Sequence, residues 1–312
     1  MSKAENPAKT REAELYQLGV LACPDCGTAI TSAHCPTCER TVVEAGNAPS
    51  LFPTRSRSIS FNLHPDQLNP EKIPMQDFFH FPPRHGLPGS GVYHLDRAHV
   101  DVIQSLPKGQ TFIEIGCGGG QMRDWVKAEG HTYLGTDIST ERVHDWLQES
   151  GGADILCDAH ALPFRDDSAA VIYSAAVWEH LAFPHLAAQE AARVLKTGGM
   201  HLGSMSFLEP WHDASYFHMT PLGVYQTLTL AGLRPLFIWP EREWHAFRAI
   251  LEMGNKATRA MRFLGRFANG FYLSPKVAQH VLKHRKWPAQ DDLIQPRAIT
   301  AGAIKWIAVK GG

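Results

Sequence analysis

Four of the six cysteines occur as two closely spaced pairs near the start of the chain. Cys23 and Cys26 form the first pair, and Cys35 and Cys38 form the second after eight intervening residues. Two such pairs can present four thiolates as a tetrahedron, which is the arrangement that a structural zinc ion requires. The alternatives are a redox-active pair or four free thiols. Because four protein ligands leave no open position, we expect this zinc to be structural rather than catalytic.

A glycine-rich turn follows a short apolar run that closes on Glu114. Gly116, Gly118 and Gly120 alternate with other residues there. Glycines supply positive φ or close backbone approach, and the helix that follows offers unpaired N–H groups and a positive dipole end. The pattern predicts a nucleotide-type cofactor site between a buried parallel strand and a helix. Dehydrogenases use the spacing GxGxxG, whereas this chain has GxGxG.

Two acidic residues follow later predicted strands at the edge where such a cofactor would lie. Asp137 comes after the second strand and Asp158 after the third. Ligands of open α/β sheets bind outside the carboxyl ends of the strands, so both positions are candidates for binding. The alternative for each is a helix cap or a surface charge.

Any proton acceptor for a reaction must lie on the same loops. The candidates are His212 first and His180 next, with His218 close to His212 in the sequence. The chain has 17 histidines, so the presence of a histidine alone is weak evidence. These three are selected because they are expected on loops at the sheet edge.

The order of elements predicts the frame for these residues. Short apolar runs at 112–115, 132–135, 153–157, 169–173, 200–206, 233–239 and 300–310 have strand composition. Most of them alternate with segments of helical periodicity, including 94–106, 184–194 and a helix that begins at Thr220, while Ser139 caps a helix with Val143, Trp146 and Leu147. Such alternation predicts a parallel sheet covered on both faces.

Composition places the chain among ordinary soluble proteins. It has 312 residues, 44% hydrophobic residues and a formal net charge of −1. This balance gives no overall field that would attract nucleic acid or an anionic membrane. No apolar run approaches the ~18 residues that span a bilayer, so we expect a cytoplasmic protein.

Three segments are expected. Residues 1–53 form an N-terminal segment with the cysteine module, 54–93 a linker or lid, and 94–312 the main domain. The second segment is rich in proline but carries Phe78, Phe79 and Phe81, which favours packing across the catalytic face over a bare linker. Within the main domain, 241–299 is expected to be a helical insertion, broken at Pro275 and Pro288, that could cap the substrate.

Five motifs in order resemble class I S-adenosylmethionine-dependent methyltransferases, within them the bacterial type 11 group. They are EIGCGGG at 114–120, GTDIS at 135–139, DAHALPF at 158–164, VWEHL at 177–181 and RVLKTGG at 193–199. The resemblance covers residues 94 to about 240 and implies a Rossmann-like, seven-stranded, mostly parallel sheet with helices on both faces. The cysteine module is similar to zinc ribbons attached ahead of some bacterial methyltransferase domains.

The resemblance also implies roles for individual residues. Asp137 would hold both ribose hydroxyls, and Asp158 would accept from the adenine amino group with the Ala159 N–H on a ring nitrogen. Glu114 would orient the glycine turn. The complete set implied to contact S-adenosylmethionine is Glu114, Gly116, Cys117, Gly118, Gly120, Asp137, Ile138, Asp158, Ala159 and Ser174.

The function expected from this resemblance is methyl transfer by in-line displacement to a small-molecule acceptor. The alternative is an rRNA or tRNA base methyltransferase, because a cysteine-ligated zinc module ahead of this fold resembles a ribosomal RNA guanine methyltransferase group. A third hypothesis is a non-catalytic scaffold. The neutral overall charge and the lack of an Asn-Pro-Pro-Tyr-type motif count against the RNA alternative.

The predicted insertion carries an unusual local charge. Residues 255–290 contain eight lysines and arginines and no acid. Within 256–267 the apolar and basic residues fall on different helical faces. This basic face is either a solvated surface or a binding site for an anionic acceptor, RNA or a membrane. The sequence does not identify the acceptor, the methylated atom or the oligomeric state.

Overall fold

The computed structural model describes residues 14–46, 48–56, 58, 60, 65, 69–86, 95–140, 151–212 and 214–312. The helix predicted to follow Ser139 lies outside the described residues. Most of the predicted 54–93 segment before residue 69 and after residue 86 also lies outside them.

Seven strands of the main domain form the predicted sheet. They are β3 (Thr111–Ile115), β4 (Thr132–Asp137), β5 (Ile155–Leu156), β6 (Ala169–Ala175), β7 (Leu195–Ser206), β8 (Leu233–Pro240) and β9 (Ala303–Lys310). Their order is β5-β4-β3-β6-β7-β9-β8, and only β9 runs antiparallel to both of its neighbours. The α/β class with a mostly parallel sheet is therefore confirmed.

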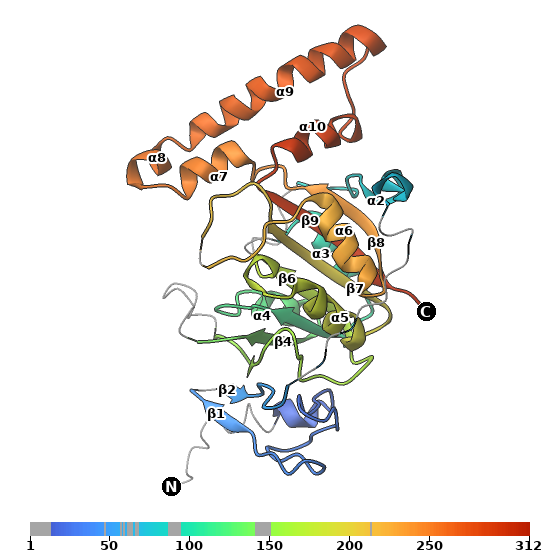
Figure 1. Ribbon diagram of the computed structural model, residues 1–312, viewed down its shortest axis with the longest axis vertical. Helices are drawn as coiled ribbons and strands as arrows, with labels where there is room; N and C mark the ends of the chain where they lie inside the picture. Colours follow the sequence, from blue (N-terminus) through green and yellow to red (C-terminus); the bar gives the residue numbers. More distant parts are fainter. Residues whose placement is uncertain are drawn as a thin grey trace.

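Helices cover both faces of this sheet (Figure 1). α5 (Pro184–Val194) and α6 (Pro221–Leu230) lie on one face, and α3 (Arg97–Ser105) lies on the other, with α4 (Arg123–Ala128) after β3. The caps follow from side-chain chemistry: Asp96 accepts from the Ala98 N–H, and Thr220 accepts from the Gly223 N–H. Pro184 and Pro221 occupy first-turn positions, where no N–H is needed.

A tryptophan from the last strand fills the centre of the core. Trp306 is fully buried and its ring lies 4.5 Å from that of Trp178. Its indole N–H donates to Nδ1 of the buried His201 at 2.8 Å. Burial lowers the pKa of His201 to about 3, so this histidine is a neutral acceptor within the core.

The N-terminal segment adds two strands, so the sheet formed by the described residues has nine strands rather than the seven predicted. β1 (Val43–Ala45) pairs with β2 (Ala48–Ser50), and β2 continues the sheet beyond β5 through a parallel Ser50–Leu156 pairing. The N–H of Ala22 also donates to the Pro163 carbonyl at 3.0 Å. The difference arises because backbone pairing between distant segments leaves no local sequence pattern.

Residues 69–86 pack beside the far edge of the sheet. They form a short 3₁₀ turn (Pro70–Lys72) and α2 (Met75–Phe78). Phe78 stacks on Tyr225 of α6 with 4.3 Å between ring centroids, and His80 meets Phe237 of β8 edge-on at 4.8 Å. These aromatic residues are anchored on the domain, while a lid across the catalytic face stays a prediction.

Four α-helices and one 3₁₀ turn separate β8 from β9 and form the insertion. They are α7 (Ala246–Glu252), α8 (Lys256–Ala260), α9 (Phe263–His284), the 3₁₀ turn Asp291–Leu293 and α10 (Ile294–Ile299). The predicted break at Pro275 is wrong, because α9 continues through this residue. Phe247 of α7 packs on Tyr272, one turn before the proline, with 6.4 Å between the rings. We infer that this packing offsets the one helical hydrogen bond that proline removes.

Among the described residues, no helix is both long and apolar enough to cross a membrane. The cytoplasmic location stays a prediction.

Gly203 in β7 gives a test of the core packing. A Cβ there would lie 2.2 Å from Cζ2 of Trp306 and 2.5 Å from the Ser174 carbonyl oxygen. We expect Gly203→Ala to lower the free energy of unfolding by at least about 1–3 kcal/mol, the usual cost of overpacking. Gly270→Ala in α9, which has open space around it, should be neutral or stabilising by about 0.4–1 kcal/mol. Urea unfolding measures both, and equal stabilities would contradict the packing.

Candidate functional site

The glycine turn after β3 adopts the backbone that its sequence predicts. Gly116, Gly118 and Gly120 have φ of +68°, +51° and +73°. Side chains are strained in this region, so glycine is favoured at each position. A Cβ on Gly116 would also lie 2.3 Å from Cγ2 of Val177. The turn therefore passes close to the loop after β6 and presents bare backbone at the sheet edge.

The second strand brings Asp137 to this turn. Ile115 pairs with Thr136 in parallel register, so β3 and β4 end side by side. The Asp137 carboxylate accepts the Gly118 N–H at 2.8 Å through Oδ2 and the Ile138 N–H at 2.7 Å through Oδ1. The two predicted cofactor elements thus meet directly, and the carboxylate holds the turn in place.

Glu114 lies beneath the turn as a buried carboxyl group. It is 8% exposed, and the Tyr133 hydroxyl donates to its Oε2 at 2.5 Å. Burial raises the pKa of Glu114 to about 8, although the hydrogen bond from Tyr133 lowers it and the charge of Asp137 raises it further. Near neutral pH this group is therefore largely protonated.

The sequence did not predict an ion pair that lies beside β4. Arg123 Nη1 lies 2.6 Å from Oδ1 of Asp154, whose Oδ2 accepts the Gly135 N–H at 2.8 Å. The guanidinium also lies 5.0 Å from the centre of the Tyr133 ring. This pair ties α4 to β4 and β5. Its spacing of 31 residues leaves no motif that would have revealed it.

Asp158 follows β5, and its carboxylate is engaged by a neighbouring histidine. Oδ1 of Asp158 lies 2.6 Å from Nδ1 of His160. Nε2 of His160 accepts the Phe183 N–H at 3.1 Å, so the ring proton must be on Nδ1 and points to Asp158. Ala159 beside it is buried. The structure therefore places this acid at the predicted edge and fixes it through His160.

Two side chains of α5 hold the loop after β5 in place through hydrogen bonds. Arg193 donates to the carbonyls of Leu162 at 2.9 Å and Phe164 at 2.7 Å. Glu190 accepts the Leu162 N–H at 2.9 Å and pairs with Arg193 at 2.8 Å. Arginine and glutamate three residues apart in a helix are visible in the sequence. Their role in positioning this loop appears only in the structure.

The strand β6 ends in a strained turn. Ser174 is fully buried, and its Oγ has no hydrogen-bond partner among the described residues. Ala176 has φ of +55°, which is uncommon for alanine. The chain then enters the 3₁₀ turn Trp178–His180. This turn places Glu179 and His180 at the carboxyl edge of the sheet.

The three candidate histidines come together beside this turn. The His212 ring lies 5.5 Å from that of His180 and 5.8 Å from that of His218. The loop that carries His212 is held by its backbone, because the Tyr216 and Phe217 N–H groups donate to the Glu179 carbonyl at 2.6 and 3.2 Å. The structure thus brings the three candidate histidines of two separate loops together. Whether any is catalytic stays a prediction.

Two acids lie beside the histidines: Glu179, which belongs to the VWEHL motif, and Glu209, which the sequence did not indicate. Ser206 Oγ lies 2.6 Å from Glu179 Oε1 and 3.1 Å from Glu209 Oε2. One hydroxyl has one proton, so it cannot donate to both carboxyl groups. Burial raises the pKa of Glu209 to about 7, although the Trp244 indole N–H donates to it at 2.6 Å and lowers that value. A protonated Glu209 would satisfy both contacts.

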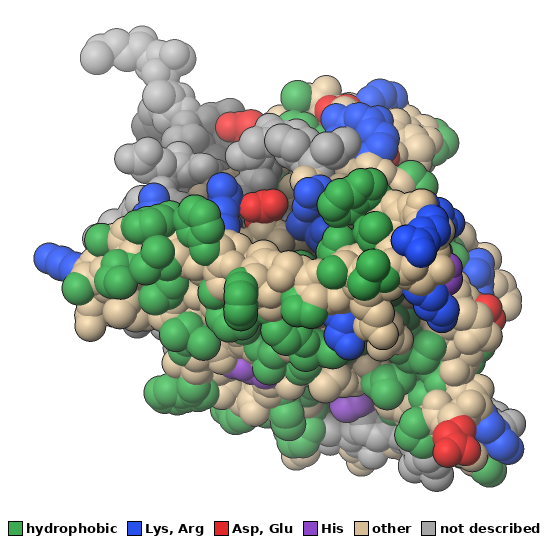
Figure 2. Space-filling view, turned by 90° about the horizontal axis from the view of Figure 1, so that it is seen from above, with side chains coloured by type: hydrophobic (Ala, Val, Ile, Leu, Met, Phe, Trp, Pro, Cys, Tyr) green, Lys and Arg blue, Asp and Glu red, His purple; other side chains and the backbone are tan. Residues whose placement is uncertain are grey.

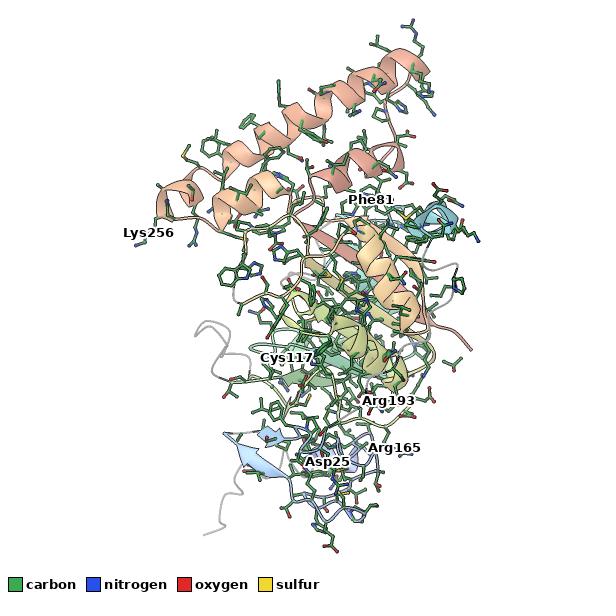
Figure 3. The ribbon with its side chains drawn as sticks, viewed as in Figure 1. Asp25, Phe81, Cys117, Arg165, Arg193 and Lys256 are labelled. Carbon is green, nitrogen blue, oxygen red and sulfur yellow. The ribbon has the colours of Figure 1, made fainter. Side chains whose placement is uncertain are left out.

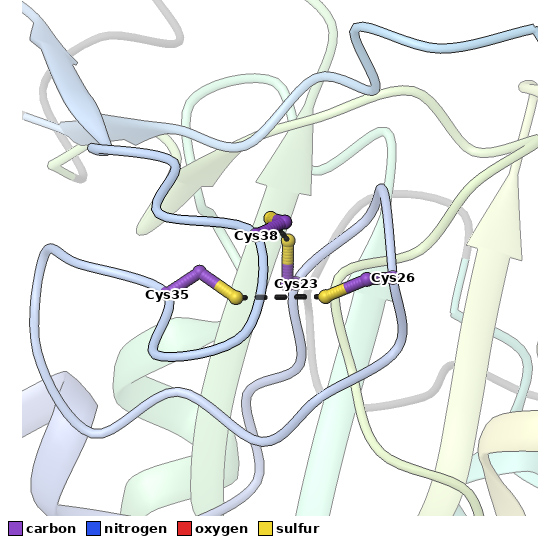
Figure 4. A group of neighbouring side chains, drawn as sticks. All are labelled: Cys23, Cys26, Cys35 and Cys38. Carbon is purple, nitrogen blue, oxygen red and sulfur yellow. Dashed lines mark hydrogen bonds between the residues drawn. The ribbon is translucent and has the colours of Figure 1, made fainter.

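The four cysteines of the N-terminal segment converge on one point (Figure 4). Sγ of Cys23 lies 3.6 Å from that of Cys38, and Sγ of Cys26 lies 3.5 Å from that of Cys35. Each sulfur lies within 4.8 Å of the others and all four are free thiols. This donor set fits a tetrahedral metal ion better than a disulfide pair.

Asp25 holds the two cysteine loops against the chain that follows them. Its carboxylate accepts from the Thr54 N–H at 2.6 Å and from Arg40 at 2.7 Å. Burial raises the pKa of Asp25, but these hydrogen bonds outweigh it and lower the pKa to about 2. The carboxylate is therefore charged at all ordinary pH values.

Comparison with known families matches residues 113–202 to the model of a methyltransferase domain. The match covers less than a third of the chain, so the likeness to a methyltransferase domain applies to this part alone. The match contains the glycine turn, Asp137, Asp158 and Glu179.

Relatives with curated descriptions match this same part. An uncharacterized methyltransferase of Mycolicibacterium vanbaalenii is 33% identical over 30% of this chain and 37% of its own length. A 2-methyl-6-phytyl-1,4-hydroquinone methyltransferase of Synechocystis is 34% identical over 31% of this chain and 32% of its own. A mouse tRNA (carboxymethyluridine(34)-5-O)-methyltransferase is 35% identical over 33% of this chain and 16% of its own. The chain thus covers about a third or less of these relatives.

Solved structures also resemble the chain at low identity. Haemonchus contortus phosphoethanolamine N-methyltransferase 2 with S-adenosyl-L-methionine has 18% identity and a TM-score of 0.44, covering 68% of this chain and 51% of that one.

The buried Glu114 predicts an unusual pH dependence of stability. Its pKa is about 8 when folded against 4.5 for an exposed glutamate, so its stabilising contribution is complete below pH 4.5 and is lost as pH rises to 8. Glu114→Gln, whose amide oxygen still accepts from Tyr133, removes this loss. Between pH 4.5 and 8, the free energy of unfolding of the variant should rise relative to that of the wild type by up to about 1.4 kcal/mol per pH unit. Urea unfolding from pH 5 to 9 measures the difference, and parallel curves would contradict it.

Proposed function

We propose that this protein is an S-adenosylmethionine-dependent methyltransferase that acts on a small-molecule acceptor. The observation that carries the proposal is the hydrogen bond from the Gly118 N–H to Asp137, which joins the glycine turn to the acid of the next strand. The methyltransferase-domain match over residues 113–202 supports the activity. The acceptor class is inferred from the surface of the loop that carries His212.

The residues at the sheet edge fit this cofactor. The bare backbone at Gly116 and Gly118 suits close approach of a methionine chain, and Asp137 suits a ribose diol because a carboxylate can accept two O–H bonds. Ser174 Oγ, buried without a partner among the described residues, adds a polar atom at the same edge. Asp158 and Ala159 would face the adenine. When bound, the cofactor supplies a methyl group activated by a sulfonium.

The protein's part in such a transfer is alignment and exclusion of water rather than acid chemistry. Trp211, Tyr216 and Phe217 are 76%, 65% and 46% exposed on the loop that carries His212. Exposed aromatic rings suit a planar or apolar acceptor. A base is required only if the acceptor must lose a proton, and His212, with His180 and His218 beside it, is the proposed group.

The second candidate function is methylation of an RNA base. One observation favours it: the exposed helices α8 and α9 carry only basic charges over 255–290 (Figure 2). Lys256 lies at the far end of this insertion, well away from Cys117 in the glycine turn (Figure 3). We therefore rank methylation of an RNA base below methylation of a small molecule. Methyl incorporation into rRNA or tRNA that weakens steeply with salt would reverse the order.

We propose that the four cysteines bind one structural zinc ion. We also propose that residues 1–53 form the cysteine module, that 54–93 form a linker or lid, and that 94–312 form the catalytic domain. The closeness of the four sulfurs supports the zinc. With four thiolates the ion would stabilise the module and take no part in methyl transfer.

Asp137→Ala tests the cofactor site. Loss of two charge-assisted hydrogen bonds, each worth about 1.5–3 kcal/mol, should weaken S-adenosylmethionine binding by at least about 100-fold. Asp77→Ala, an exposed position on α2, is the matched control and should bind as the wild type does. Calorimetry with the folded proteins measures both. No binding by the wild type, or no loss in Asp137→Ala, would refute the proposed function.

The zinc proposal predicts one zinc per chain by elemental analysis of protein purified without added metal. Cys26→Ser should lose most of this zinc and lower the melting temperature, since metal binding contributes folding free energy. Cys157→Ser, a buried thiol outside the module, should retain the full zinc content. Equal zinc content in the two variants would exclude the four-cysteine site.

A further inference from the structure

A second group of metal-ligand side chains lies at the carboxyl edge of the sheet. Ligand atoms of Glu179, His180 and His212 all lie within 4.8 Å of one another. Two imidazoles and one carboxylate are a common donor set for divalent transition metals, and they leave further coordination positions open. The group is distant in sequence from the four cysteines and differs from them in donor chemistry.

The buried carboxylate gives an independent indication of a ligand. Glu179 is fully buried, and its Oε1 accepts from the Ser206 hydroxyl and N–H at 2.6 and 3.3 Å. Its Oε2 is buried and has no hydrogen-bond partner among the described residues. A buried carboxylate oxygen without a partner is costly, so an occupant of opposite charge would remove the cost.

The tautomer of His212 suits a metal ligand. Its Nδ1 lies 2.9 Å from the Pro210 carbonyl oxygen, which can only accept, so Nδ1 carries the proton. Nε2 is therefore the basic nitrogen. Metal-binding histidines usually donate their other N–H to a carbonyl or carboxylate, which fixes the ring and the tautomer.

The backbone holds the three ligands together from two separate segments. Ala176, with φ of +55°, turns the chain so that Glu179 and His180 follow β6 at the sheet edge. The Tyr216 N–H binds the Glu179 carbonyl at 2.6 Å and so fastens the loop of His212 to the same turn. Strain of this kind persists where the surrounding structure over-determines it, often at a functional site.

We propose that Glu179, His180 and His212 bind one divalent transition-metal ion. Three protein ligands leave open positions beside the exposed aromatic loop, where an acceptor with a hydroxyl or other oxygen donor could coordinate. This last step rests on the proposed function, whereas the metal site itself does not. With the metal ion bound, His212 and His180 would be ligands, so of the three candidate bases His218 alone would be available to accept a proton.

Cobalt(II) separates this site from the four cysteines. Protein that carries one equivalent of zinc, at the four cysteines, is titrated with Co²⁺ and followed by visible absorption. We expect one further equivalent to bind with weak ligand-field bands and no sulfur-to-metal charge transfer, because the ligands are nitrogen and oxygen. Bands from thiolate would report exchange at the cysteines instead. No saturable binding without thiolate bands would overturn the proposal.

Variants identify the ligands. His212→Ala and His180→Ala should each weaken this Co²⁺ binding by at least about tenfold. Glu179→Gln keeps an acceptor for Ser206 but lacks the charge, so it should fold and also bind weakly. His185→Ala on α5 is the control and should bind as the wild type does. Undiminished binding in all three ligand variants would refute the assignment.

Calorimetry of the same samples separates this proposal from the proposed function. His212→Ala should retain S-adenosylmethionine affinity within about twofold, since His212 is not among the proposed cofactor contacts. A wild type that binds Co²⁺ but no S-adenosylmethionine would refute the methyltransferase function alone. The reverse result would refute the metal site alone.

Discussion

In-register parallel pairing of three central strands is the constraint on which the site depends. Ile115 at the end of β3 pairs with Thr136 of β4 on one side and Ser174 of β6 on the other. The three strands therefore end level, and the residues that follow them emerge at one edge. A slip of one residue would turn every side chain of a strand to the opposite face. The contact between Gly118 and Asp137 is a consequence of this register, because the turn after β3 lies directly beside the end of β4.

The sequence predicted those features that depend on local pattern. Apolar runs located the seven strands of the main domain, and glycines marked turns that need positive φ. It did not predict β2 beside β5, the Arg123–Asp154 pair or the contact of Trp244 with Glu209, because each joins segments far apart in the chain. The continuous α9 was missed for a related reason, since tertiary packing on α7 outweighs the local effect of Pro275. The histidines were placed on the correct loops, yet their convergence required the fold.

The N-terminal module and the main domain share a sheet edge, which couples their stability. β5 has only two residues and would be the exposed edge of the sheet without β2. An unpaired edge is a site for aggregation, and here the cysteine module covers it. The Ala22–Pro163 hydrogen bond joins the module to the loop that begins at Asp158. Order in the cysteine loops, which Asp25 reinforces, therefore supports the loop proposed to face the adenine.

The short segment after β6 links the cofactor side of the site to the histidine side. Val177 fills the space that a side chain on Gly116 would occupy, so the glycine turn rests on this segment. Two residues later, Glu179 binds Ser206 and the loop of His212. Because a single turn beginning at the strained Ala176 carries both contacts, the two halves of the site cannot shift independently. The insertion reaches the same point, because the Trp244 indole N–H donates to Glu209, whose other carboxyl oxygen lies beside Ser206.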